Sequence, residues 1–323
     1  MLVVVLLFAL GLVLLIKGGD WFVDGATGIA HRFHLPELLI GATVVSIGTT
    51  LPEVMVSATS ALEGVGGIAY GNAIGSVICN TSLIAALTVA IRPAAINKKS
   101  LVLPAGFFFL AAAFYCMTAY TAGRFERWTG LTLLAMFVVY ILLTIRQMKA
   151  HPELAEDEDE GESEKERELW QQLVLLVVGA AAIAEGANLL VDNGTKIAEA
   201  LGVPDSVIGL TMVALGTSLP ELVTAITSLA KGHGALSLGN VIGANLFNLV
   251  LVTGTSATLA PFTIPTDKLL AGVNSSLLVD LPVMLGVMLI LCVPALTTGK
   301  LRRWQGVLLL CAYIGFTVFQ FVS

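Results

Sequence analysis

The amino-acid sequence predicts an all-α membrane protein whose ten transmembrane helices form two inverted five-helix repeats. The first observation behind this is composition: of 323 residues, 56% are hydrophobic and 12% are charged, and the mean hydropathy is +0.90. Soluble globular domains carry about 25% charged residues. The second observation is a series of long apolar segments, and the third is an internal duplication. No basic cluster suggests a nucleic-acid partner.

The duplication centres on a six-residue motif that occurs twice inside apolar segments. Its copies are Gly48-Thr49-Thr50-Leu51-Pro52-Glu53 and Gly216-Thr217-Ser218-Leu219-Pro220-Glu221, which lie 168 positions apart (221 minus 53). Self-similarity at one fixed offset is the signature of a structural repeat. The same offset pairs further residues without a gap, namely Asp24 with Asp192, Pro36 with Pro204, Gly71-Asn72 with Gly239-Asn240, Gly75 with Gly243 and Asn80 with Asn248.

Each half of the chain contains five segments long enough to cross a bilayer, which takes about 20 apolar residues. Because five is an odd number, the second repeat must enter the membrane upside down relative to the first. Inverted repeats with a binding site at their interface near the midplane are typical of secondary transporters. The expected spans are 2–23, 36–62, 70–91, 101–120, 128–148, 169–191, 207–230, 236–259, 269–291 and 304–321.

An acidic segment divides the chain into a first repeat (1–148), a linker (149–168) and a second repeat (169–323). The linker is rich in Asp and Glu and has no apolar periodicity, so we expect a solvated connection. With the N-terminus outside the cell membrane, the outer loops hold few basic residues. The positive-inside rule then places both termini outside and the linker in the cytoplasm. The basic residues left in outer loops are Arg124, Arg127, Lys196 and Lys268.

Interruptions are expected in the second, third, seventh and eighth helices. Proline lacks a backbone donor and clashes with the preceding turn, so Pro52 and Pro220 should break the second and seventh helices. The glycine-asparagine motifs that begin at Gly71 and Gly239 should interrupt the third and eighth. Carbonyls freed near 45–49 and 213–217 need other partners in lipid, and a bound cation can supply one.

Glu53 and Glu221 are the strongest candidates for a functional site. A charge at the bilayer centre costs at least about 2.5–3.5 kcal/mol, so two facing carboxylates require a cation or a proton between them. Two negative charges match one divalent ion or two monovalent ions, which gives a physical basis for exchange. The alternative is a protonated structural glutamate in a kinked helix, but two copies in register favour a site. Neutral oxygens of the type that suits sodium and calcium come from Thr49, Thr50, Thr217, Ser218, Ser76, Asn80 and Asn248.

Other polar residues have simpler interpretations. Asn72 and Asn240 either contribute to a site or belong to close helix packing. Asp24 and Asp192 are expected near the membrane interface, where capping or helix-dipole roles are favoured over transport. The four cysteines are far apart, without metal-ligand spacing, and are expected to be core residues.

The paired motifs, each followed by Gly-Asn-X-Ile-Gly-(Ser/Ala), resemble the alpha repeats of the sodium/calcium exchanger superfamily, in particular its bacterial and archaeal antiporters. The resemblance covers the whole chain. It implies a core of helices two, three, seven and eight against which helices one and six slide. It also implies that Glu53, Glu221, Thr49 and Thr217 bind calcium, and that Asn80 and Asn248 stand near the central site. The implied sodium ligands are Thr50, Ser218, Ser76 and the backbone carbonyls of Ser46 and Ala214.

The chain departs from the pattern of this family at two positions. Ala244 stands where many members have serine, which removes one sodium ligand, and Asn248 stands where some members have aspartate. The absent aspartate argues against potassium co-transport. The motif usual in the proton/calcium branch is also missing, so the resemblance favours sodium as the counter-ion.

The expected function is therefore electrochemical exchange of sodium for calcium by alternating access, with no enzymatic activity and no cofactor besides the transported ions. No Gly-x4-Gly-Lys-(Ser/Thr) motif for ATP is present. The expected partners are calcium, sodium and the lipid bilayer, and one chain should suffice for transport. A proton/calcium (or other divalent cation) antiporter is the main alternative; a cation channel or an intramembrane enzyme fits less well.

Overall fold

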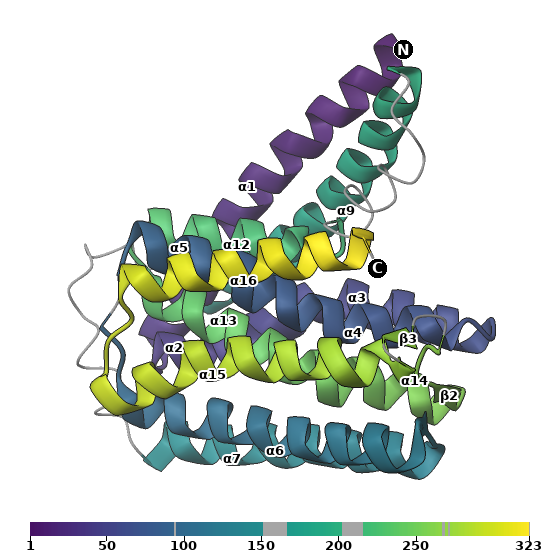
Figure 1. The fold of residues 1–323 in the computed structure, drawn as a ribbon. Helices are drawn as coiled ribbons and strands as arrows, with labels where there is room; N and C mark the ends of the chain where they lie inside the picture. Colours follow the sequence, from purple (N-terminus) through teal and green to yellow (C-terminus); the bar gives the residue numbers. More distant parts are fainter. Residues whose placement is uncertain (94, 151–166, 202–215, 267–268, 271, 323) are drawn as a thin grey trace.

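The computed structural model describes residues 1–323 except 94, 151–166, 202–215, 267–268, 271 and 323 (Figure 1). Its first half contains α1 (Leu2–Arg32), α2 (Glu37–Ile40), η1 (Gly41–Val45), α3 (Ser46–Leu62), α4 (Gly66–Cys79), η2 (Asn80–Ala85), α5 (Ala86–Ile91), α6 (Lys98–Ala122), β1 (Arg124–Phe125) and α7 (Arg127–Ala150), where η denotes a π-helical turn. Its second half contains α9 (Leu169–Ala200), α12 (Leu219–Ala230), α13 (Gly234–Phe247), η4 (Asn248–Val252), α14 (Thr253–Leu259), β2 (Phe262–Thr263), β3 (Leu269–Leu270), β4 (Val273–Asn274), η5 (Ser276–Asp280), α15 (Leu281–Thr298) and α16 (Arg303–Val322).

The molecule is a helical membrane protein, as the composition predicts. Within the described residues, 8 helical stretches are long and apolar enough to cross a membrane, and α12 is a shorter apolar helix. Large apolar side chains stay exposed on outer helix faces, such as Leu6 and Val13 of α1 and Leu142 of α7. In water such faces would be costly, but in lipid they are the stable arrangement. The count of ten spans stays a prediction, because part of the seventh falls in 202–215.

Several helix boundaries differ from those expected. α1 and α9 continue to Arg32 and Ala200, well past the predicted ends at 23 and 191. The ninth span begins at Ser276 rather than 269, because the hairpin of β3 and β4 occupies the residues before it. The other strand pair joins β1 to β2 and so links the two repeats at one end of the bundle.

The predicted positions of the helix interruptions were wrong in three spans. Helix α3 runs continuously through Pro52, and the irregular turn of that span is η1, which precedes it. In the third and eighth spans the irregular turns begin at Asn80 and Asn248 rather than at the glycine-asparagine motifs. Proline removes only its own donor, so neighbouring hydrogen bonds can keep a helix intact. Pro220 does lie at the start of a helix, α12.

α1 and α9 lie side by side and form an arm that leans away from the other helices (Figure 1). Their close approach depends on glycines. A Cβ on Gly18 would lie 2.9 Å from the backbone nitrogen of Ile183, and one on Gly179 would lie 2.5 Å from that of Phe22. Small residues of this kind let membrane helices approach to backbone contact. The two long helices are therefore built to pack as one unit.

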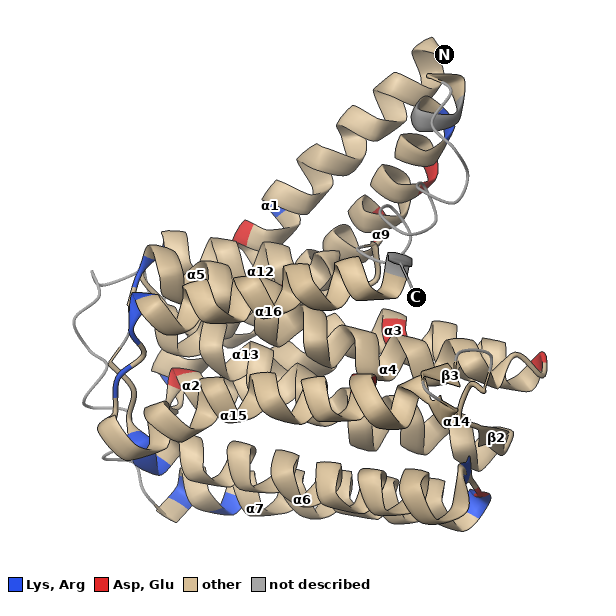
Figure 2. Cartoon of the chain, viewed as in Figure 1, with Lys and Arg blue, Asp and Glu red and all other residues tan. Residues whose placement is uncertain are grey.

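α13 is the central helix of the remaining bundle. Every residue from Leu236 to Phe247 is buried, and the helix packs against η1, α2, α3, α6 and η2. Tyr140 of α7 donates a hydrogen bond of 2.8 Å to the carbonyl of Ala42 in η1, which supplies a partner where the helix widens. Lys and Arg gather mainly at the end of the bundle where α2 begins (Figure 2).

Candidate cation site

Two carboxylates from repeat-equivalent positions form the centre of the candidate site. Glu53 lies in α3 and Glu221 in the first turn of α12, and both side chains are 0% exposed. They are close enough to repel each other electrostatically. No hydrogen bond reaches any of their four carboxylate oxygens within the described structure. Because burying unpaired like charges is costly, this arrangement is suited to holding positive charge.

Hydroxyl groups accompany the two carboxylates. The hydroxyls of Thr49 and Thr50 lie beside the Glu221 carboxylate. Buried polar groups are nearly always hydrogen-bonded, so the unpartnered Thr50 hydroxyl and the four unpartnered carboxylate oxygens point to a ligand. Such oxygens are the ligands that hard cations prefer. The buried polar side chains with unpartnered atoms that the sequence singles out are Thr50, Ser76, Asn80, Ser218 and Asn248.

The two asparagines predicted to stand near the central site occupy equivalent places in the fold. Asn80 begins η2 and Asn248 begins η4, so each opens the π-helical turn of its repeat. Both side chains are 0% exposed, and neither amide has a hydrogen-bond partner for its nitrogen or oxygen in the described residues. π-Helical turns are frequent at functional sites. The duplication predicted this pairing, but not the turns that accompany it.

Asn72 and Asn240 show where the two repeats differ. Asn72 donates to the Ser57 hydroxyl at 2.9 Å and to the Glu53 carbonyl at 3.3 Å, which holds α4 against α3. Asn240 instead accepts a hydrogen bond of 3.2 Å from the Thr49 hydroxyl with its side-chain oxygen. Its backbone carbonyl accepts one of 2.9 Å from the Ser46 hydroxyl. Asn240 therefore positions the α3 residues of the site, a role that the sequence left open between packing and ligation.

The remaining predicted ligands, Ser46, Thr217 and Ala214, differ in how deeply they are buried and in whether the structure describes them. Ser46 is fully buried, and its carbonyl accepts from the Thr49 hydroxyl at 3.5 Å. Thr217 is only half-buried and lines a larger cavity together with Gly216 and Pro220, so it lies at the edge of the buried cluster. Ala214 lies outside the described residues.

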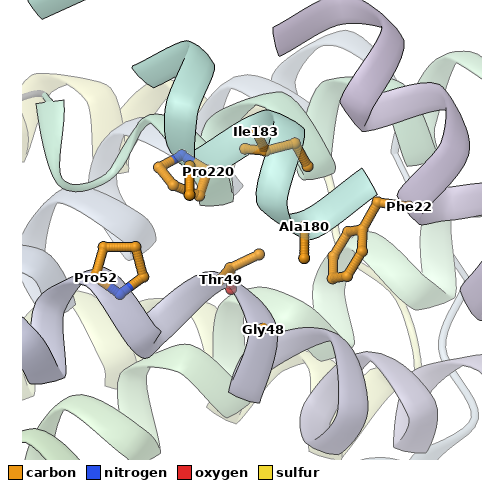
Figure 3. Close-up of a pocket in the computed structure, with 8 residues that line it drawn as sticks. Phe22, Gly48, Thr49, Pro52, Ala180, Ile183 and Pro220 are labelled. Atoms are coloured by element: carbon orange, nitrogen blue, oxygen red, sulfur yellow. The ribbon is translucent and has the colours of Figure 1, made fainter. Parts of the chain in front are cut away.

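α1 and α9 cover the site from one side. A small pocket next to Thr49 lies between Pro52 and Pro220, and its lining includes Phe22 of α1 and Ala180 of α9 (Figure 3). A cavity of about 840 Å³ extends from there between α3 and α9. Its described lining is mainly apolar, with polar contributions from the residues Thr217, Asn188 and Asp192. The arm of α1 and α9 thus supplies one wall of the pocket beside Thr49.

The sequence analysis treated Cys79 only as a core residue and did not place it near the site. Cys79 lies close to Ser218, to both carboxylates and to Tyr313 of α16. Its only sequence signal is that it directly precedes Asn80. Sodium and calcium prefer oxygen to sulfur, so Cys79 contributes to the wall of the site rather than to its ligands. Among the described residues no three of His, Cys, Asp and Glu form a metal-binding group; the candidate site combines two carboxylates with neutral oxygens.

The fold and this geometry define a class: helical membrane proteins that hold hard cations between two duplicated halves. The model of the sodium/calcium exchanger protein family matches residues 3–146 and 171–322, and the chain belongs to this family. Its relatives include the putative antiporter CaxA of Alkalimonas amylolytica, which is 36% identical with 100% of both chains covered. The sodium/calcium exchanger MaX1 of Methanosarcina acetivorans is 32% identical over 98% of both chains.

A solved structure agrees with this assignment. The sodium-calcium exchanger NCX_Mj, soaked with sodium and calcium ions, superposes with a TM-score of 0.80 at 34% sequence identity, and 97% of each chain is covered. The likeness therefore extends over nearly the whole chain.

Proposed function

We propose that this protein is a secondary active antiporter that exchanges sodium for calcium across the cell membrane by alternating access. The observation that carries the proposal is the pair Glu53 and Glu221. They come from equivalent positions of the two repeats, lie fully buried, and have no hydrogen-bond partner in the described structure. Two fixed negative charges balance one calcium ion or two sodium ions. Calcium and sodium therefore cannot both be fully neutralised by these carboxylates at the same time. Competition for the same charges is what couples the two fluxes.

The ligand assignment follows the residues around this pair. Glu53, Glu221, Thr49 and Thr217 would coordinate calcium, and Asn80 and Asn248 would stand near the centre of the site. The relatives support this choice of ions, since MaX1 is named a sodium/calcium exchanger and NCX_Mj was soaked with sodium and calcium or strontium. The proposed sodium ligands are Thr50, Ser218, Ser76 and the carbonyls of Ser46 and Ala214.

We further propose the organisation that such a cycle requires. The repeats 1–148 and 169–323 lie inverted in the membrane, the linker 149–168 is cytoplasmic, and both termini are outside. The gathering of Lys and Arg at the end of the bundle where α2 begins supports this orientation (Figure 2). Helices α1 and α9 would then move against the core to expose the site to each side in turn.

The test is radioactive calcium uptake into proteoliposomes that are loaded with sodium and diluted into sodium-free buffer. Uptake is expected only with the outward sodium gradient, and it should be accompanied by sodium efflux. Uptake driven by a proton gradient alone would identify a proton/calcium antiporter instead. Uptake indifferent to both gradients would indicate a channel and would contradict exchange.

Replacement of Ser76 by Ala should weaken sodium binding more than calcium binding. Ser76 is 3% exposed, and its hydroxyl has no hydrogen-bond partner in the described residues. A hydrogen bond to a charged group is worth about 1.5–3 kcal/mol. If coordination of sodium by the hydroxyl is of similar strength, the sodium concentration for half-maximal exchange should rise about tenfold or more. Ser100→Ala is the matched control, because Ser100 of α6 is also buried and unpartnered. Equal effects of both substitutions would contradict the assignment.

A further inference from the structure

An ion-pair network ties α1 to the core at the end of α12. Lys231 directly follows α12; its ammonium group pairs with the Asp24 carboxylate, lies 3.7 Å from Asp20 Oδ1, and donates to the Asp20 carbonyl at 3.1 Å. Arg167 adds a contact of 3.3 Å to the other Asp24 oxygen. The Asp24 side chain is only 17% exposed. Its expected capping role was wrong, because α1 continues to Arg32.

The helices beside this network are packed in direct contact. A Cβ on Gly19 of α1 would lie 2.8 Å from both the Thr227 hydroxyl and a Val223 methyl group of α12. Backbone and side chains therefore leave no space between α1 and α12 there. On the side of the candidate site where α12 ends, α1 is therefore in closed contact with the core.

The internal repeat identifies the counterpart of the α1–α12 contact, which is the contact between α9 and α3. The 168-residue offset relates α1 to α9 and α12 to α3, so Gly19 and Val223 correspond to Ala187 and Met55. Both counterparts line the cavity of about 840 Å³ between α3 and α9, so the equivalent contact is open. The turns after α3 and α12 match closely, because Gly64 and Gly232 have φ of 82° and 93°.

The charges of the network are not repeated. The equivalents of Lys231, Asp24 and Asp20 are Glu63, Asp192 and Asn188. Glu63 and Asp192 are both exposed, and Asp192 lines the open cavity. Closure of α9 against α3, in the manner of α1 against α12, would bring these two carboxylates together. Opposite charges therefore stabilise the closed contact between α1 and α12, whereas like charges would oppose closure between α9 and α3.

We propose that Lys231 is a gating residue that, by pairing with Asp20 and Asp24, holds the carrier with the α3–α9 cavity open, and that Glu63 and Asp192 oppose closure of this cavity. The proposal rests on the proposed alternating access of the carrier. It assigns a function to the difference in charge between two otherwise equivalent turns. None of the residues involved belongs to the candidate cation site.

The test measures conformation without transport. A cysteine replaces Asn188, which is exposed in the cavity, in a background that carries Cys311→Ser and keeps the three buried cysteines, and its rate of modification by a maleimide reports how often the cavity is open. Partly exposed ion pairs are worth up to about 1 kcal/mol, so single charge changes should alter the rate two- to fivefold. Glu63→Lys supplies the missing opposite charge and should slow modification, and Lys231→Glu should slow it as well.

Charge exchange separates an electrostatic role from a purely structural one. In a background of Asp20→Asn and Arg167→Gln, which removes the other charges of the network, Lys231→Glu combined with Asp24→Lys restores an opposite pair and should return the rate toward that of this background. A cysteine at Ala122, which is exposed at the end of α6 outside the cavity, is the control and should react equally in all variants. Unchanged rates at Asn188→Cys, or no recovery in the exchanged pair, would overturn the proposal. Altered rates in a protein that fails to exchange sodium for calcium would refute the proposed function alone.

Discussion

Glu53→Gln and Glu221→Gln should each abolish sodium-driven calcium uptake. Each substitution keeps the size of the side chain and removes one of the two buried charges. The attraction between a cation and a carboxylate away from water is worth several kcal/mol, and each 1.4 kcal/mol is a factor of ten in affinity. Calcium affinity should therefore fall at least about 100-fold in either variant.

Thermal unfolding of the purified protein measures this loss independently of transport. A ligand that binds only the folded state raises its stability in proportion to the logarithm of ligand concentration over Kd. Calcium should raise the melting temperature of the parent protein and leave the melting temperatures of both Gln variants unchanged. Glu126→Gln is the matched control, since Glu126 is a partly exposed carboxylate paired with Arg124 at 2.9 Å. Calcium-dependent stabilisation that persists in the Glu53 and Glu221 variants would refute the site.

Gly239→Ala should destabilise the protein strongly, whereas the equivalent change Gly71→Ala should not. A Cβ on Gly239 would lie 2.1 Å from the carbonyl oxygen of Leu38, while a Cβ on Gly71 would meet nothing within 4 Å. Forcing a methyl group into a packed interface costs about 1–3 kcal/mol. The same methyl group in an open helical position is favourable by up to about 1 kcal/mol.

The damage at Gly239 should also reach the cation site. Its neighbour Asn240 binds Ser46 and Thr49, so a shift of α13 relative to α2 would displace the α3 residues of the site. Melting temperature and its increase with calcium should both fall in Gly239→Ala and remain at parent values or above in Gly71→Ala. Similar behaviour of the two variants would show that α13 and α4 pack alike, contrary to the structure.

The sequence could single out candidate site residues because their chemistry conflicts with their surroundings. Carboxylates, hydroxyls and amides stand out inside apolar segments, and the duplication shows that they recur at one offset. The structure buries Glu53, Glu221, Thr50, Ser76 and Ser218 as the pattern implied. Helix irregularities were harder to place, because a π-helical turn depends on partners from distant helices. The hydrogen bond from Tyr140 to the Ala42 carbonyl is one such partner, and no local pattern reveals it.

By itself, the sequence determined that this chain is a duplicated helical membrane protein with two buried carboxylates, because composition and a fixed repeat offset are properties of the sequence alone. Only the tertiary structure decided how the two halves differ. Gly71 and Gly239, or Glu63 and Lys231, are equivalent by sequence position, yet one member of each pair lies in a closed contact and the other does not. The physical reason is that the two repeats meet different neighbours, because Gly239 lies in a helix buried at the centre of the bundle whereas Gly71 is exposed.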